Sequence, residues 1–123
     1  MPILTRFWRW RRVTSRNRRH NPAAAAPSRI ADQPLRGFHI VVDAGNGAGG
    51  FYATDVLQKL GADISGSQFL EPDGRFPNHI PNPENEEAMA SVCTATVAAK
   101  ADLGVIFDTD VDRAGCVDSA GRE

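Results

Sequence analysis

The chain has 123 residues, and its formal net charge of −1 hides two parts of opposite sign. Residues 1–36 hold nine arginines and one acidic residue, a net charge of +8, whereas residues 37–123 hold five basic and 14 acidic residues, a net charge of −9. There is no run of about 18 apolar residues, so a helix spanning a membrane is excluded, and two cysteines exclude a disulfide scaffold and favour a reducing compartment. We therefore expect an Arg-rich segment with a linker over residues 1–36 and one domain over residues 37–123.

The first 20 residues contain seven arginines and no acid, with Trp8 and Trp10 among them. Three interpretations remain open: a disordered tail or a misplaced start of the gene, an Arg-rich transit peptide, and an arm over Arg6–Arg19 that binds nucleic acid. Nucleic acid is the least favoured of the three. Asn21–Pro34, rich in alanine and proline, is typical of a linker. We expect an intracellular protein, in the cytoplasm or a plastid.

The first half of the domain predicts a strand, a loop, a helix and a second strand. Phe38–Asp43 is an apolar, β-branched run, and the glycine-rich loop Ala44–Gly50 follows it. A helical pattern extends from residue 51 to 60, and Gly61 stands where a glycine commonly ends a helix. Ala62–Phe69 is a weaker strand pattern.

The second half predicts a rigid loop, a longer helix and two strands. Glu71–Pro83 contains four prolines, and its lone histidine, His79, is of the kind that is more often structural than catalytic. Asn82 is expected to cap a helix that reaches about Lys100. Asp102–Asp108 is a strand pattern apolar on both faces, and Gly115–Asp118 is a short fourth strand.

This order of elements predicts the topology of the sheet. Two helical crossovers make the first three strands parallel and right-handed. The turn before the fourth strand is too short for a crossover, so the fourth strand should lie antiparallel beside the third. We predict an α/β fold, a three-layer α/β/α unit with a small mixed sheet.

The sequence feature most indicative of chemistry is the acidic motif after the third strand, Asp108-Thr109-Asp110-Val111-Asp112-Arg113. Ligand sites of open α/β sheets lie at this end of the strands. Residues two apart on a straight strand are ~6.6 Å from each other, too far for oxygens that bind one Mg²⁺ at about 2.0–2.1 Å. The backbone must therefore curl if Asp108, Asp110 and Asp112 are to converge. An oxygen-only acidic cluster favours Mg²⁺; the alternative is a solvated acidic turn.

Two other known motifs begin with aspartates at the same spacing. An EF-hand loop is excluded, because Arg113 occupies its glycine position and Ser119 its glutamate position. The nucleophile loop of haloacid dehalogenases, an apolar strand followed by D-x-D-x-T, fits except that Asp112 replaces the threonine. A phosphatase with Asp108 as nucleophile therefore remains an alternative.

The loop after the first strand satisfies the spacing G-x-G-x-x-G with Gly45, Gly47 and Gly50. In the context of a strand and a helix, this spacing is typical of dinucleotide-binding sites. However, Asp63 lies at the wrong end of the second strand to bind a ribose, and Asp43 would face the pyrophosphate with like charge. We favour a tight turn that needs positive φ and close packing.

The glycine-rich loop, the proline-rich loop and the acidic motif, in this order along the chain, resemble the α-D-phosphohexomutases. This is the superfamily of phosphoglucomutase, phosphomannomutase and phosphoglucosamine mutase. The likeness covers about Leu35–Glu123 and is carried by Val41–Gly49, Glu71–Gly74, Phe76–His79, Pro81–Glu84, and Ala101–Gly104 leading into Asp108–Arg113. Enzymes of this superfamily have four domains around one cleft, and the chain is similar to the second domain only.

The resemblance implies a metal-binding domain. Asp108, Asp110 and Asp112 would bind Mg²⁺, and the catalytic residue Arg113 would orient the phosphate of a phosphoserine from the first domain, as suits a forked guanidinium. The parent reaction moves a phosphoryl group between the 1- and 6-positions of a hexose phosphate. The sugar and substrate-phosphate loops belong to other domains, so we expect a hexose phosphate to bind only in a full-length context and this chain alone to be inactive.

Overall fold

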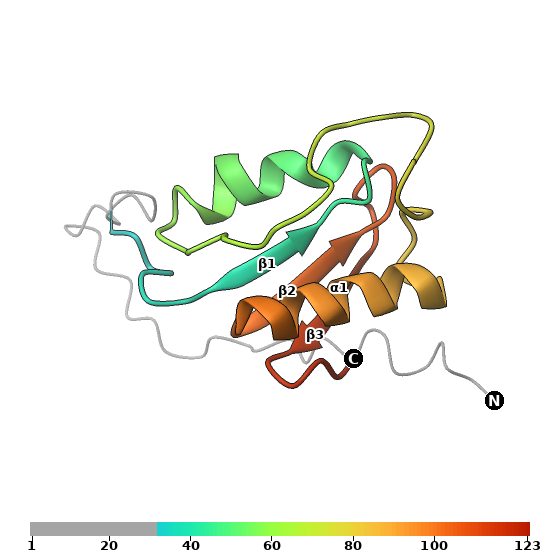
Figure 1. The fold of residues 1–123 in the computed structure, drawn as a ribbon. Helices are drawn as coiled ribbons and strands as arrows, with labels where there is room; N and C mark the ends of the chain where they lie inside the picture. Colours follow the sequence, from blue (N-terminus) through green and yellow to red (C-terminus); the bar gives the residue numbers. More distant parts are fainter. Residues whose placement is uncertain (1–31) are drawn as a thin grey trace, which may run out of the picture.

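The computed structural model of the protein describes residues 32–123, so the interpretations of Arg6–Arg19 lie outside the described residues. The elements are the strand β1 (Ile40–Asp43), a 3₁₀ turn η2 (Ala48–Gly50), a π-helix η3 (Tyr52–Leu57), the helix α1 (Glu86–Ala99), and the strands β2 (Leu103–Phe107) and β3 (Ala114–Asp118). Figure 1 shows them in chain order.

The three strands form one mixed sheet in the order β1-β2-β3. β1 and β2 are parallel, with Val42 beside Val105, and β3 returns antiparallel to β2, with Cys116 beside Val105. The expected antiparallel fourth strand is therefore confirmed. The carboxyl ends of β1 and β2 lie at the same edge of the sheet, which is where ligand sites of such sheets form.

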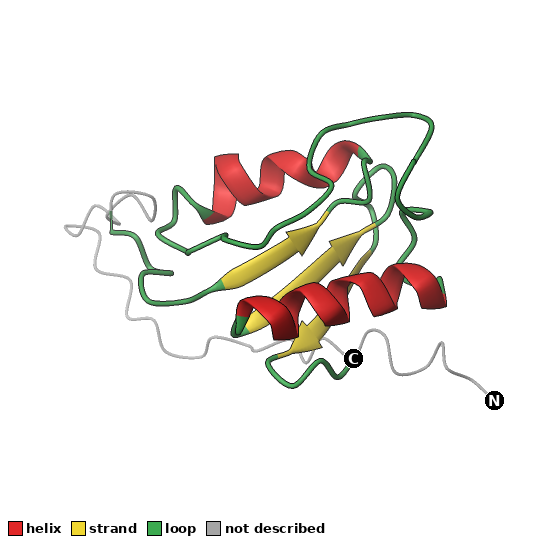
Figure 2. Cartoon of the chain, viewed as in Figure 1, coloured by secondary structure: helices red, strands yellow, loops and turns green. Residues whose placement is uncertain are grey.

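Helices cover both faces of the sheet, as Figure 2 shows. On one face α1 packs against β2 and β3 through Met89, Val92, Ile106 and Val117, and on the other η3 packs against β1 and β2 through Ala53, Val42 and Phe107. β2 is buried from both sides because its side chains alternate between the two clusters. The three-layer α/β/α arrangement is confirmed.

The expected second strand, Ala62–Phe69, is wrong as a continuous strand. The segment runs beside β1 in the parallel sense but pairs with it only at two isolated bridges, His39 with Asp63 and Asp43 with Gln68. Between them Gly66 has a φ of +87°, which turns the chain out of the ladder. The Ser67 hydroxyl accepts a hydrogen bond from the backbone N–H of Val42 at 2.9 Å, where a continuous strand would offer a carbonyl.

The ends of the helices also differ from expectation. Asn85, not Asn82, caps α1, because its side chain accepts a hydrogen bond from the N–H of Ala88 at 3.0 Å. The Asn82 side chain instead accepts from the N–H of Glu84 within the preceding turn. The helix expected over residues 51–60 is the shorter π-helix η3, preceded by the 3₁₀ turn η2. It ends at Leu57, four residues before Gly61, although Gly61 does have a positive φ of +100°.

Within residues 32–123, every helix is too short or too polar to cross a bilayer.

Candidate metal site

The aspartate loop, Asp108–Arg113, joins β2 to β3 and is curled. The N–H of Val111 donates to the carbonyl of Asp108 at 3.4 Å, and the N–H of Asp108 donates to the carbonyl of Arg113 at 3.2 Å. Val111 takes a φ of +67°, a conformation that β-branched residues rarely adopt. This turn replaces the straight strand that would have held the carboxylates apart.

The curled loop brings Asp108, Asp110 and Asp112 together. Each offers one carboxylate oxygen, and these oxygens lie within 4.8 Å of one another; Asp108 is buried and the other two are exposed. Two ligands of one octahedral Mg²⁺ lie about 3 Å apart when adjacent and about 4.2 Å apart when opposite. The three oxygens would therefore draw closer together around a bound hard divalent cation, and the oxygen-only donor set matches Mg²⁺ or Mn²⁺.

Arg113 is folded back onto the same cluster. Its backbone N–H donates to Oδ1 of Asp108 at 3.2 Å, and its Nε donates to Oδ2 at 3.0 Å. Nε also lies 3.8 Å from Oδ1 of Asp112, and the Arg113 side chain remains 56% exposed. With Nε committed to Asp108, the terminal guanidinium nitrogens are left to meet an anion from solvent, in the forked geometry that suits phosphate.

The close approach of the three carboxylates changes the pKa values of Asp108 and Asp112. Burial alone would raise the pKa of Asp108, but hydrogen bonds with Asp112 and with the backbone and side chain of Arg113 hold that pKa below its ordinary value. Hydrogen bonding with Asp108 and then Asp110, together with their negative charge, raises the pKa of Asp112 to about 6. Asp112 thus carries a proton in mildly acidic solution, and a bound cation would displace it.

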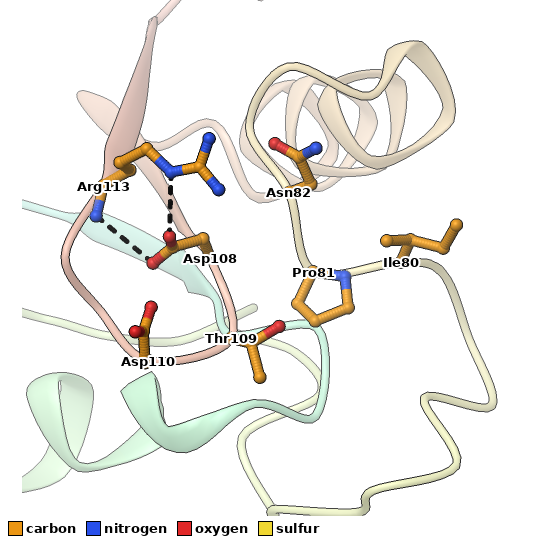
Figure 3. A pocket seen from close by; sticks show the side chains of 7 residues that line it. All are labelled: Ile80, Pro81, Asn82, Asp108, Thr109, Asp110 and Arg113. Carbon is orange, nitrogen blue, oxygen red and sulfur yellow. Dashed lines mark hydrogen bonds and ion pairs between the residues drawn. The ribbon is translucent and has the colours of Figure 1, made fainter.

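A pocket of about 370 Å³ opens beside the cluster. Asp108, Thr109, Asp110 and Arg113 line one side, and Ile80–Asn82, here called the pocket wall, lines the other. Figure 3 shows the two sides facing each other, with the Arg113 guanidinium on the side toward Asn82. Asp112 belongs to the carboxylate cluster but not to the pocket lining.

The glycine-rich loop, Ala44–Gly50, packs directly against the backbone of the aspartate loop. A Cβ on Gly47 would come within 3.0 Å of the Thr109 carbonyl oxygen, and the N–H of Ala48 donates to that oxygen at 2.9 Å. A Cβ on Gly50 would collide with the carbonyl of Leu70. These contacts support the tight turn with close packing rather than a dinucleotide cradle, since protein backbone occupies the space beside the glycines.

The pocket wall is the part of the site that sequence reasoning did not identify. The four prolines of Glu71–Pro83 predict a rigid surface but not which residues of it face the aspartate loop. The only trace in the sequence is that position 45 is a glycine, since a Cβ there would come within 2.8 Å of the Pro81 side chain. The glycine alone does not tell which segment approaches it.

Comparison with known proteins agrees with these motifs. The pattern of the family described as phosphoglucomutase/phosphomannomutase, alpha/beta/alpha domain II, matches residues 21–121. The chain is 43% identical over 87 residues to a phosphomannomutase/phosphoglucomutase of Pseudomonas syringae pv. tomato, covering 71% of the chain and 18% of that relative. It is 40% identical over 87 residues to a phosphoglucomutase of Neisseria gonorrhoeae, covering 71% of the chain and 19% of the relative.

A solved structure is also similar. A crystal structure of a phosphoglucomutase/phosphomannomutase family protein from Burkholderia thailandensis superposes with a TM-score of 0.67 at 38% sequence identity, over 76% of this chain and 21% of that one. The chain thus spans about a fifth of the length of the relatives it matches. The match over residues 21–121 shows that the chain belongs to the phosphoglucomutase/phosphomannomutase family, as its alpha/beta/alpha domain II.

Proposed function

We propose that this chain is the metal-binding domain of a phosphohexomutase, in which Asp108, Asp110 and Asp112 hold Mg²⁺ and Arg113 orients a phosphoryl group. The observation that carries the proposal is the convergence of three carboxylate oxygens within 4.8 Å beside a pocket. A bound Mg²⁺ would supply positive charge to neutralise a transferring phosphoryl group. The reaction we infer for the complete enzyme is phosphoryl transfer between the 1- and 6-positions of a hexose phosphate.

The residues of the aspartate loop would have different roles in holding the cation and the phosphoryl group. Asp108, tied to Arg113 through both backbone and side chain, fixes the guanidinium relative to the metal ligands. Asp110 and Asp112 are exposed and supply the remaining charge. The guanidinium would grip phosphate oxygens at the mouth of the pocket, which excludes water from that side and keeps the phosphoryl group in register. Residues from outside this domain would have to supply the phosphoserine and the sugar contacts.

Calorimetry with Mn²⁺ and Mg²⁺ on the whole chain tests the metal-binding proposal. We expect weak binding by the wild type, because within residues 32–123 no further His, Cys, Asp or Glu joins the three aspartates and water would complete the shell. Asp110→Asn should bind at least tenfold more weakly. Equal binding by the two proteins would contradict the proposed site.

An activity assay tests the inference that the domain does not act alone. Purified chain is incubated with glucose 1-phosphate, mannose 1-phosphate or glucosamine 1-phosphate, with Mg²⁺ and the matching bisphosphate. We expect no isomerisation, since an isolated domain forgoes most of the roughly 7–11 kcal/mol that positioning contributes. Turnover that survives purification and disappears in Asp108→Ala would contradict this inference.

The two alternative functions predict different results. A phosphatase with Asp108 as nucleophile would hydrolyse an aryl phosphate and lose that activity in Asp108→Asn; the comparisons do not favour it, and both Asp108 oxygens already accept hydrogen bonds from Arg113. Binding of nucleic acid through Arg6–Arg19 would show a steep salt dependence that deletion of residues 1–20 abolishes.

A further inference from the structure

Asp43, at the end of β1, is a buried carboxylate surrounded by donors. The N–H of Gly45 donates to its Oδ1 at 2.9 Å, and Nε2 of Gln68 donates to its Oδ2 at 2.8 Å. Nε2 of His79 lies 2.9 Å from Oδ1 and 3.0 Å from Oδ2. These three contacts satisfy both oxygens of the buried carboxylate within the protein.

His79 is equally buried, and both of its ring nitrogens face acceptors. Nδ1 lies 2.9 Å from the carbonyl oxygen of Ile80, and the His79 side chain is only 2% exposed. A carbonyl can only accept, so Nδ1 carries a proton. Nε2 faces the Asp43 carboxylate, so a second proton lies between ring and carboxylate. The ring of Phe69 packs edge-on against the imidazole, with 5.5 Å between the ring centroids.

This pair reaches the pocket wall directly. The Ile80 carbonyl that accepts from His79 also accepts from the N–H of Asn82 at 2.8 Å, which closes the wall into a turn. Pro81 packs against Gly45, whose N–H is bonded to Asp43. Pro81 is buried, whereas Ile80 is 63% exposed, so Pro81 supplies the apolar burial of the wall. The position of the wall relative to the aspartate loop (Figure 3) therefore rests on Pro81 together with the polar contact of the Ile80 carbonyl with His79.

We infer that the Asp43–His79 pair positions the pocket wall opposite the aspartate loop, which makes His79 a positioning residue for the site. The inference rests on the proposed function for what the pocket binds, but its structural part stands on these contacts alone. A lone loop histidine thereby acquires a role at a site that it does not line.

The test compares His79→Gln with His39→Gln in the whole chain. His39 is a matched control, because its Nε2 also contacts a backbone carbonyl, that of Ser65, at the opposite end of β1. The main readout is hydrogen exchange of the Asn82 amide, measured by NMR and corrected for the change in global stability. The amides of Asp108 and Val111 serve as internal references, because both donate hydrogen bonds within the aspartate loop.

We expect Asn82 exchange to accelerate at least tenfold in His79→Gln beyond the global change, with no such excess in His39→Gln. Equal corrected exchange in both variants would overturn the inference. If His79→Gln does not fold, the wild type decides: the His79 ring N–H protons and the Asn82 amide should exchange through the same opening, with equal free energies. Exchange of Asn82 while the ring protons stay protected would overturn it.

The same spectra separate this inference from the proposed function. Mn²⁺ added to the wild type should broaden the amide signals of both the aspartate loop and Asn82, and in His79→Gln the broadening of Asn82 should weaken while that of Thr109 persists. If Mn²⁺ broadens neither in the wild type, the metal proposal fails, whereas the exchange data still decide the role of His79.

Discussion

Two acidic residues lie at the carboxyl ends of neighbouring parallel strands, at the same edge of the sheet, and their surroundings differ. Asp43, the last residue of β1, is fully buried, and its two oxygens accept hydrogen bonds from Gly45 and Gln68 and contact His79. Asp108, after β2, is also buried, but it meets Arg113 and two more carboxylates at the mouth of a pocket. The first environment satisfies a charge internally; the second accumulates like charge that an external cation would neutralise. The groups around each carboxylate therefore distinguish the structural Asp43 from the cation-binding Asp108, whereas their positions at the ends of strands are alike.

The largest expected effect comes from breaking the internal site. Asp43→Asn replaces one of two buried acceptor oxygens by an amide donor that faces another donor, so we expect a loss of about 2–3 kcal/mol in the free energy of unfolding. Urea denaturation followed by circular dichroism measures this loss. Asp110→Asn is the matched substitution at the exposed site and should change stability by less than about 0.5 kcal/mol. Similar losses in both variants would remove the distinction between the two regions.

A divalent cation should stabilise the protein through the aspartate loop. Mg²⁺ at ten times its dissociation constant raises the free energy of unfolding by about 1.4 kcal/mol if it binds only the folded state. Thermal denaturation in MgCl₂, compared with NaCl at equal ionic strength, measures the shift. Asp110→Asn, which should bind at least tenfold more weakly, should gain at most about 0.4 kcal/mol, whereas His39→Gln should retain the full gain; a full gain in Asp110→Asn would place the cation elsewhere.

Acid should weaken metal binding, and the sign follows from Asp112. Because hydrogen bonding with Asp108 raises the pKa of Asp112 to about 6, this carboxyl is protonated below that pH and must lose a proton to bind a cation. Affinity for Mn²⁺ should therefore be level above about pH 7 and fall about tenfold per pH unit below about 6. Calorimetry at pH 5, 6 and 7 gives the profile. In Asp112→Asn the fall should shift to lower pH; an affinity that does not change between pH 5 and 7 would contradict the assignment.

The smallest effect concerns a residue outside both regions. Lys100 ends α1 with a φ of 53°, a left-handed conformation that costs a side chain more than it costs glycine. Lys100→Gly should raise the free energy of unfolding by about 0.5–1 kcal/mol. Urea denaturation measures the gain. This background would keep more of the Asp43→Asn protein folded and so sharpen the comparison, while a loss of stability would show that the lysine side chain makes a contact worth more than the strain.

The aspartate loop could be predicted from the sequence because its evidence is local. Three acids at alternate positions after an apolar strand require a curl to converge, and the turn at Val111 provides it. Topology was likewise accessible, since connection lengths decide which strands are parallel. The prediction of a strand over Ala62–Phe69 was wrong for an equally local reason. Gly66 turns the chain away from β1, and the Ser67 hydroxyl takes the place of a backbone carbonyl as the acceptor for Val42. The pattern of apolar residues reports neither feature.

The pocket wall and the role of His79 depend on contacts between distant segments. Asn82 lies two residues before Glu84 and Asn85 lies directly before Glu86, and only the folded chain decides which asparagine caps α1. His79 meets Asp43 across 36 positions of sequence because Gly45 admits Pro81 at close range. Spacing along the chain carries no information about that approach, so the sequence predicts a rigid loop but not its partner.

The central claim is that Asp108, Asp110 and Asp112 form the cation site of this domain. The most direct measurement is a titration of the ¹⁵N-labelled chain with Mn²⁺, whose unpaired electrons broaden the signals of nearby amides. The account predicts that the amides of Asp108–Arg113 broaden first in the wild type and not in Asp110→Asn. Broadening that begins elsewhere in the chain, or that is identical in the two proteins, would contradict it.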